Sequence, residues 1–191
     1  MKPDTHGTKD RILKSAYSLF YREGFSRVSV DAIAEHAKLT KRTIYYHFKS
    51  KDDIAAAALE DLHRHLLPQF RTWIGPETAE PAELIGNLFE ALKSWAERDP
   101  WLGSGFSRIA AELADLPGHP ARRAASSHKA SVETWLADLL ATKGVADAVQ
   151  LARQIMALIE GSTSLSLIHG DTQYIQSAGM AAVSLLSHRS A

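Results

Sequence analysis

A run of cationic, hydroxyl-bearing and aromatic side chains at residues 40–51 has the composition and spacing of a nucleic-acid contact surface. Lysine and arginine can reach guanine O6 and N7 or neutralise phosphates, while threonine and tyrosine hydroxyls can bond phosphate oxygens. The side chains expected to face outward are Lys41, Arg42, Thr43, Tyr45, Tyr46 and His47. Only Ile44 and Phe48, four residues apart, are expected to face inward. Each outward residue alone fits an ordinary solvated helix face, but the combination favours duplex DNA.

Two short helices joined by a tight turn are predicted to position this surface. Ser29 is the expected N-cap of a helix over residues 30–37, and Thr40 is the expected N-cap of a second helix over residues 41–48. The free N–H groups that follow Ser29 are placed to bind a phosphate. Lys51 begins the next helix, from which it can contact the DNA backbone on the far side.

This segment resembles the helix-turn-helix of TetR-type transcriptional repressors. That pattern reads Phe-x-x-x-Gly-(Phe/Tyr), then a helix, then (Thr/Ser)-x-x-(Leu/Ile)-Tyr-x-His-Phe-x-x-Lys. The matching residues here are Phe20, Gly24, Phe25, Thr40, Thr43, Ile44, Tyr45, His47, Phe48 and Lys51. The match covers roughly residues 8–52, about a quarter of the chain. Lys38 replaces the usual glycine of the turn, so we expect a left-handed lysine at modest strain.

The resemblance implies roles for the individual residues. Three of them would approach the bases: Lys41, Arg42 and Thr43. Those that would mainly contact the DNA backbone, together with the capping Thr40, are Ser29, Tyr45, Tyr46, His47 and Lys51. Arg42 stands where a small residue or proline is common, so it would add either a base contact or a further phosphate contact.

The charge distribution separates this segment from the rest of the chain. The whole chain is neutral, with 22 basic and 22 acidic residues. Residues 1–51 hold eleven basic and five acidic residues, whereas residues 52–191 hold eleven and seventeen. A basic N-terminal segment followed by an acidic remainder fits a DNA reader whose larger domain stays off the duplex.

Composition limits the other classes of protein. The 191 residues, enough for one or two domains, contain no cysteine, which excludes disulfides and thiolate metal sites. The N-terminal residues are too polar for a signal peptide. The most apolar region, residues 155–168, is interrupted by Glu160 and Gly161, so we expect no membrane span and a cytoplasmic protein.

The whole chain is predicted to be all-α. We expect a helix-turn-helix DNA-binding domain over residues 1–51 and, as the resemblance implies, a six-helix effector-binding and dimerisation domain over residues 52–191. A break or kink is expected at Pro68. The nine predicted helices cover about residues 8–23, 30–37, 41–48, 51–67, 82–98, 104–114, 121–142, 146–168 and 172–187.

An arginine among glycines and aromatics at residues 101–108 raises the question of a ligand site. If Arg108 faces the interior it needs an anion, from a ligand or from Asp99, Glu112 or Glu160. TetR-type proteins enclose a small-molecule effector among their middle helices, so by resemblance we expect a pocket there. Its predicted lining is Phe89, Trp95, Phe106, Arg108, Ile109 and Trp135. The alternative is that the aromatics form core and Arg108 a salt bridge.

The last two predicted helices carry long faces of small and apolar side chains. A two-helix face that cannot bury itself favours a symmetric four-helix contact between copies of the chain. The alternative is that these faces only complete the monomer core. TetR-type proteins are homodimers through their last helices, so the resemblance implies a homodimer through about residues 146–187.

No catalytic or metal-binding signature is present in the sequence. The nine histidines are scattered, and His63 and His65 are expected on different helix faces. We therefore expect no enzyme, no metal and no cofactor. The sequence predicts a ligand-responsive regulator, a repressor that binds a palindromic DNA operator as a homodimer and is released by a small-molecule effector. The alternative is a non-specific or architectural DNA-binding protein without an effector.

Overall fold

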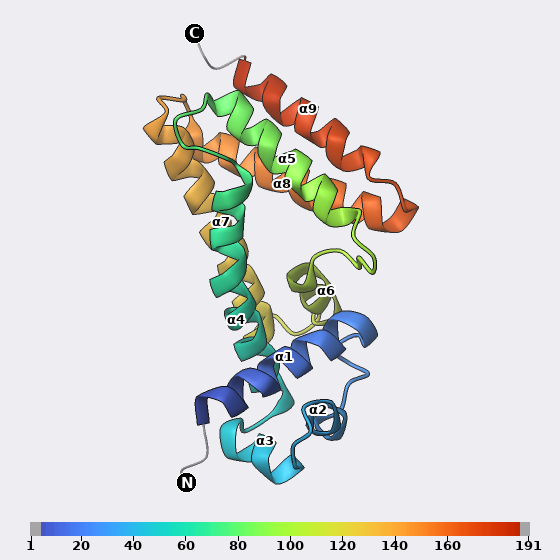
Figure 1. The fold of residues 1–191 in the computed structure, drawn as a ribbon. Helices are drawn as coiled ribbons and strands as arrows, with labels where there is room; N and C mark the ends of the chain where they lie inside the picture. The colour runs from blue at the N-terminus through green and yellow to red at the C-terminus, as the bar shows by residue number, and fades with distance from the viewer. Residues whose placement is uncertain (1–4, 188–191) are drawn as a thin grey trace. The chain divides into compact units, whose positions relative to one another are not determined.

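The computed structural model describes residues 5–187, and every regular element in that range is an α-helix (Figure 1). This confirms the all-α prediction. The helices are α1 (Thr5–Glu23), α2 (Val30–His36), α3 (Lys41–His47), α4 (Lys51–Trp73), α5 (Pro81–Ala96), α6 (Gly105–Glu112), α7 (Pro120–Thr142), α8 (Ala148–His169) and α9 (Gln173–Ser187).

The end of helix α4 differs from the sequence prediction. The predicted end near Leu67 is wrong, because α4 continues through Pro68 to Trp73. Proline lacks an amide hydrogen and disfavours a helix interior. Here the helix continues past the proline because the following residues, Phe70 and Ile74, are buried in a hydrophobic core. Tertiary packing thus outweighs the local preference of the proline.

The described residues group into two compact units. The N-terminal unit comprises the chain up to His65 together with Ser104–His128, and the C-terminal unit comprises Leu66–Gly103 together with the chain from Lys129 onward. Helices α4 and α7 therefore contribute residues to both. This grouping reflects backbone contacts, and the functional boundary at residue 51 stays a prediction.

The N-terminal unit is built around α1, which contacts α2 and α6, while α2 contacts α3. Apolar side chains at helical spacing explain this packing, because they form one apolar face on each helix and that face is stabilised by burial. Among the largest fully buried side chains of that core are Ile12, Phe20, Ile33, Ile44, Ile54, Leu59 and Phe106.

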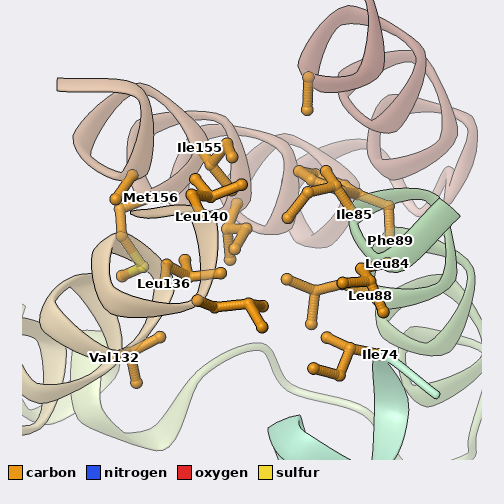
Figure 2. Close-up of a cluster of buried hydrophobic side chains, with 14 of the residues drawn as sticks. Ile74, Leu84, Ile85, Leu88, Phe89, Val132, Leu136, Leu140, Ile155 and Met156 are labelled. Atoms are coloured by element: carbon orange, nitrogen blue, oxygen red, sulfur yellow. The ribbon is translucent and has the colours of Figure 1, made fainter. Parts of the chain in front are cut away.

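The C-terminal unit contains one large hydrophobic core. Within it α9 packs against α5 and α8 (Figure 1). Figure 2 shows the side chains that meet between α5, α7 and α8; its labelled members are Ile74, Leu84, Ile85, Leu88, Phe89, Val132, Leu136, Leu140, Ile155 and Met156. Of the helices described, none is both long enough and apolar enough to cross a membrane.

A glycine permits the close approach of α5 and α9, which gives a direct test of this packing. A Cβ at Gly179 would lie 2.7 Å from the Cβ of Phe89, whereas a Cβ at Gly86 in α5 meets nothing within 4 Å. We expect Gly179→Ala to lower the free energy of unfolding by about 1–3 kcal/mol, the usual cost of overpacking. Thermal melting should detect this.

Gly86→Ala is the matched control for that substitution. It should raise the free energy of unfolding by about 0.5–1 kcal/mol, because alanine is the better helix former. Equal melting temperatures for the two variants would contradict the close α5–α9 contact.

Candidate nucleic-acid interface

Helices α2 and α3 begin at side-chain caps, as the sequence predicted. The hydroxyl of Ser29 accepts a hydrogen bond from the N–H of Ala32 at 3.1 Å, and the hydroxyl of Thr40 accepts one from the N–H of Thr43, also at 3.1 Å. Each helix has only seven residues. Helices this short are marginal alone in water, so the caps and the buried face that includes Ile44 are needed to keep them formed.

The turn between the two helices contains the strained lysine that the sequence predicted. Lys38 has φ 51°, in the left-handed region, which confirms that expectation. The cost is offset by hydrogen bonds at the end of α2, where the Arg11 guanidinium donates to the carbonyl of Ala37 at 2.6 Å. Sequence reasoning missed Arg11, since it lies on α1, 26 residues away from its acceptor.

The outer face of α3 carries the predicted set of side chains. Tyr46 is 77% exposed and Tyr45 49% exposed, and Lys41 and Arg42 are also exposed. Thr43 and His47 are half-buried. Ile44 and Phe48 face inward, so the predicted orientation of this helix is confirmed. The face therefore presents cations, hydroxyls and aromatic rings to solvent in one contiguous strip.

Lys41 forms an exposed ion pair at the start of α3. Its Nζ lies 2.8 Å from Oδ2 of Asp31, and the hydrogen bond and charge of that carboxylate raise the pKa of Lys41. Exposed ion pairs contribute little to stability, so Lys41 can exchange Asp31 for a phosphate or a base edge at small cost.

Lys51 has an internal role that the sequence did not reveal. Its ammonium donates to the carbonyls of Phe25 at 3.0 Å and Val28 at 3.1 Å, and lies 4.3 Å from the centre of the Phe25 ring. An ammonium has three N–H donors. Two of them thus fix the loop between α1 and α2 to the start of α4, which leaves one for the predicted phosphate contact.

Glu112, at the end of α6, fixes the same loop from the other side. Its carboxylate accepts hydrogen bonds from the N–H of Phe25 at 2.9 Å and of Ser26 at 2.8 Å. Burial alone would raise the pKa of Glu112, but these amide hydrogen bonds and the nearby charge of Arg108 outweigh it and lower the pKa. Sequence reasoning considered Glu112 only as a partner for Arg108, because nothing local marks a contact across 86 residues.

The residues predicted to line an effector pocket divide equally between the two units. Phe106, Arg108 and Ile109 belong to the N-terminal unit. The members in the C-terminal unit are Phe89, Trp95 and Trp135. Phe106 stacks on His128 with ring centres 3.8 Å apart. Three of the predicted residues therefore lie in each unit, and their role in binding stays a prediction.

The three predicted residues in the C-terminal unit have different surroundings. Phe89 is buried and lines an open depression of about 520 Å³ between α5 and α9. Trp95 packs edge-on against Trp101, and Trp135 stacks on Phe70. Both tryptophans are half-buried against the hydrophobic core. Contacts with the core therefore cover much of each tryptophan side chain.

The alternative salt bridge for Arg108 is not formed within residues 5–187. Glu112, four residues further along α6, directs its oxygens to the loop amides, and Glu160 pairs with Lys129. The Nε of Arg108 is buried without a hydrogen-bond partner. Arg108 still interacts electrostatically with Glu112, since its charge is one cause of the lowered pKa of that carboxylate.

The histidines in the described part of the chain do not gather into a metal site. Nδ1 of His63 lies 2.9 Å from Nδ1 of His128, while Nδ1 of His65 lies 2.8 Å from the carbonyl of Asp61. Among the residues that the structure describes, no group of three or more potential metal ligands occurs.

Comparison with known proteins places this geometry in context. The family described as bacterial regulatory proteins, tetR family, matches residues 12–58. The chain is 36% identical over 62 residues to the HTH-type transcriptional regulator TtgR of Pseudomonas putida, covering 32% of this chain and 30% of that protein. It is 30% identical over 93 residues to the HTH-type transcriptional repressor NicS of Pseudomonas putida, covering 49% and 43% of the two chains.

The matches to these curated relatives span less than half of their length, but the fold match is nearly complete. A TetR transcriptional regulator from Streptomyces avermitilis superposes with a TM-score of 0.82 at 27% identity, covering 94% of this chain and 98% of that one. The names of these similar proteins all describe transcriptional regulators.

The Glu112 contact predicts a pH-dependent loss of stability. Glu112→Gln should lower the free energy of unfolding at pH 7 by about 1 kcal/mol, since charged hydrogen-bond acceptors contribute more than neutral ones but this one is exposed. Because the pKa of Glu112 is lowered in the folded chain, its stabilisation is present at neutral pH. It is lost as the pH falls below the ordinary value of 4.5 and through the folded value.

Thermal melting between pH 3 and pH 7 would check this, with Glu60→Gln, an exposed carboxylate on α4, as the control. The melting temperatures of Glu112→Gln and the unmodified chain should converge at the acid end. A constant difference across the range would contradict the contact.

Proposed function

We propose that this chain is a sequence-specific, ligand-responsive repressor of the TetR family of bacterial regulatory proteins, whose model matches residues 12–58. The observation that carries the proposal is the outer face of α3, with Lys41, Arg42, Tyr45 and Tyr46 exposed on a helix capped by Thr40. Packing alone poorly explains such a face. Since a bacterial chromosome lies in the cytoplasm, we place the protein there.

We propose that α3 enters the major groove of duplex DNA. In helix-turn-helix proteins the N-terminal residues of the recognition helix contact base edges. Lys41, Arg42 and Thr43 occupy those positions here. The residues proposed to contact phosphates are Ser29, Thr40, Tyr45, Tyr46, His47 and the remaining N–H of Lys51.

We further propose that the protein acts as a homodimer on a palindromic operator. One recognition helix reads only a few base pairs, whereas two related by a two-fold axis read two half-sites. The partner surface would lie on α8 and α9, within residues 146–187, where large apolar side chains remain in water. These are Val149, Leu165, Leu167, Ile168, Tyr174 and Met180.

Release by an effector would act through α4 and α6. Both helices fix the loop before α2, α4 through Lys51 and α6 through Glu112. A small molecule that contacts α6 at Phe106, Arg108 and Ile109 would shift these contacts and change the spacing of the two recognition helices. The contacts proposed for the C-terminal unit remain Phe89, Trp95 and Trp135. DNA and effector then oppose each other reciprocally.

Repression is proposed from the likeness to NicS, whose name describes a repressor. Occupancy of the operator would then block transcription. The competing proposal is a general DNA-binding protein without an effector. Such a protein would show a steep salt dependence without a preferred sequence.

Tyr45 offers a test of the docking geometry that does not depend on knowing the operator. Tyr45→Ala should weaken binding to a fluorescent random-sequence duplex at least about fivefold, equivalent to ~1 kcal/mol, by removing a phosphate contact. Fluorescence anisotropy would measure it. Because Tyr45 is 49% exposed, the melting temperature should change little. The affinity of Tyr45→Phe, which loses only the hydroxyl, should lie between those of the unmodified chain and Tyr45→Ala. Unchanged affinity for Tyr45→Ala would contradict this docking.

Ile168 tests the proposed dimer surface. It is 69% exposed on α8, so Ile168→Glu should leave the fold intact but place a charge in the proposed interface. Analytical ultracentrifugation should show a dimer for the unmodified chain and a monomer for the variant. Leu116→Glu is the matched control, because Leu116 is 50% exposed on a turn outside residues 146–187. A variant that stays dimeric would place the interface elsewhere.

A further inference from the structure

A carboxylate from α2 reaches the first turn of α3, where the side chains proposed to read bases begin. Oδ2 of Asp31 lies 2.8 Å from Nζ of Lys41, the first residue of α3, and accepts a hydrogen bond from it. Both side chains are exposed, Asp31 at 67% and Lys41 at 51%. Arg42, the next residue, forms no ion pair with any residue that the structure describes. Two adjacent cations on the same helix therefore approach DNA in different states, one paired with a carboxylate and one not.

Stability does not explain this ion pair. Exposed pairs contribute little, because water screens both charges and two side chains must be held in one geometry. The pair does offset a local cost, since α3 has two cations and no acid in its first turn, the end of a helix where the dipole disfavours positive charge. That cost arises from the cations themselves, which are placed there to face DNA. The role of Asp31 therefore lies in its effect on Lys41.

Pairing with Asp31 changes which acceptors suit Lys41. An ammonium has three N–H donors, and Asp31 occupies one of them, so two remain. Guanine O6 and N7 are neutral acceptors that a lysine can bind in the major groove. Such a base edge can join the ammonium without repelling the carboxylate already bound there. A phosphate is negatively charged, so a phosphate and Asp31 on the same ammonium would repel each other. To bind a phosphate, Lys41 must give up Asp31, whereas on a base edge it can keep it.

We propose that Asp31 is a specificity-determining residue, which directs Lys41 toward base edges and withholds it from phosphates. Binding that ignores sequence depends on phosphate contacts, so withholding one cation from them weakens such binding. Binding to a site that places an acceptor base edge opposite Lys41 keeps the contact. Asp31 acts through Lys41 and needs no DNA contact of its own. This inference rests on the proposed function, because it specifies how the same DNA-binding face selects its operator.

The salt dependence of binding to a random-sequence duplex tests the effect of Asp31 on phosphate contacts. Asp31→Asn removes the charge and nearly keeps the shape. In the full chain it should raise the affinity about two- to fivefold. It should also steepen the slope of log affinity against log salt concentration by about 0.9, the value of one added phosphate contact. Fluorescence anisotropy at several salt concentrations measures both quantities. The melting temperature should change little, because the ion pair is exposed.

Glu35→Gln is the matched control for the loss of one negative charge. Glu35 is exposed on α2, four residues after Asp31 and so on the same face of the helix, but it forms no ion pair with a described residue. Glu35→Gln should leave the salt slope unchanged. Asp31→Asn should also leave the slope unchanged when it is added to Lys41→Met, because Asp31 acts through Lys41. An unchanged slope for Asp31→Asn alone would overturn the proposal, as would an equal steepening in Glu35→Gln or in the absence of Lys41.

Discrimination between DNA sequences provides the second readout. The affinities for a duplex enriched by in vitro selection and for a random-sequence duplex are compared at one salt concentration. Their ratio should fall about two- to fivefold in Asp31→Asn, because the random duplex gains Lys41 as a phosphate contact while the selected duplex already binds it through a base edge. The ratio should not change in Glu35→Gln. A ratio that stays constant or rises in Asp31→Asn would overturn the proposal.

The two readouts separate this inference from the function on which it rests. If the unmodified chain prefers no DNA sequence, the repressor proposal fails, and the salt slopes still decide whether Asp31 withholds Lys41 from phosphates. If a sequence is preferred but Asp31→Asn changes neither the slope nor the ratio, the role of Asp31 fails and the repressor proposal remains.

Discussion

The DNA-binding face depends on hydrogen bonds that reach the loop between α1 and α2 from distant helices. Helices of seven residues cannot maintain their geometry alone in water. Lys51 satisfies the carbonyls of Phe25 and Val28, and Glu112 satisfies the amides of Phe25 and Ser26. One loop is thus fixed by a cation from α4 and a carboxylate from α6. Together with the buried faces of α2 and α3, these two contacts set the orientation of the two helices.

The same two contacts would carry the proposed effector signal to the DNA-binding helices without a long chain of intermediates. Arg108 lies one helical turn before Glu112, so a change of charge at the first residue is felt at the second. An equilibrium shift requires only that the ligand prefer one of two states. A carboxylate at the Glu112 position suits this role, because its hydrogen bonds are strong when it is ionised and weaken when its surroundings turn negative.

Features of the fold that arise locally could be predicted from the sequence. Ser29 and Thr40 cap their helices, and Ile44 faces inward, because caps and periodicity involve neighbours in the chain. The left-handed Lys38 could be anticipated because the resembling pattern has glycine there. Contacts between distant residues could not be predicted. Nothing in the sequence near Arg11, Lys51 or Glu112 indicates the distant backbone groups that they bind. Likewise, the packing of Phe70 carries α4 through Pro68. The aromatic residues assigned to one pocket divide between two units, since aromatic residues mark a core as readily as a ligand site.

In vitro selection of random duplex DNA by the purified chain at physiological salt would show whether α3 reads sequence or merely attracts phosphate. If α3 reads sequence, one palindrome should be enriched, with half-sites spaced by about one helical turn or more. No enrichment, with binding that declines smoothly as salt rises, would contradict sequence reading and assign the face to general contact with the DNA backbone.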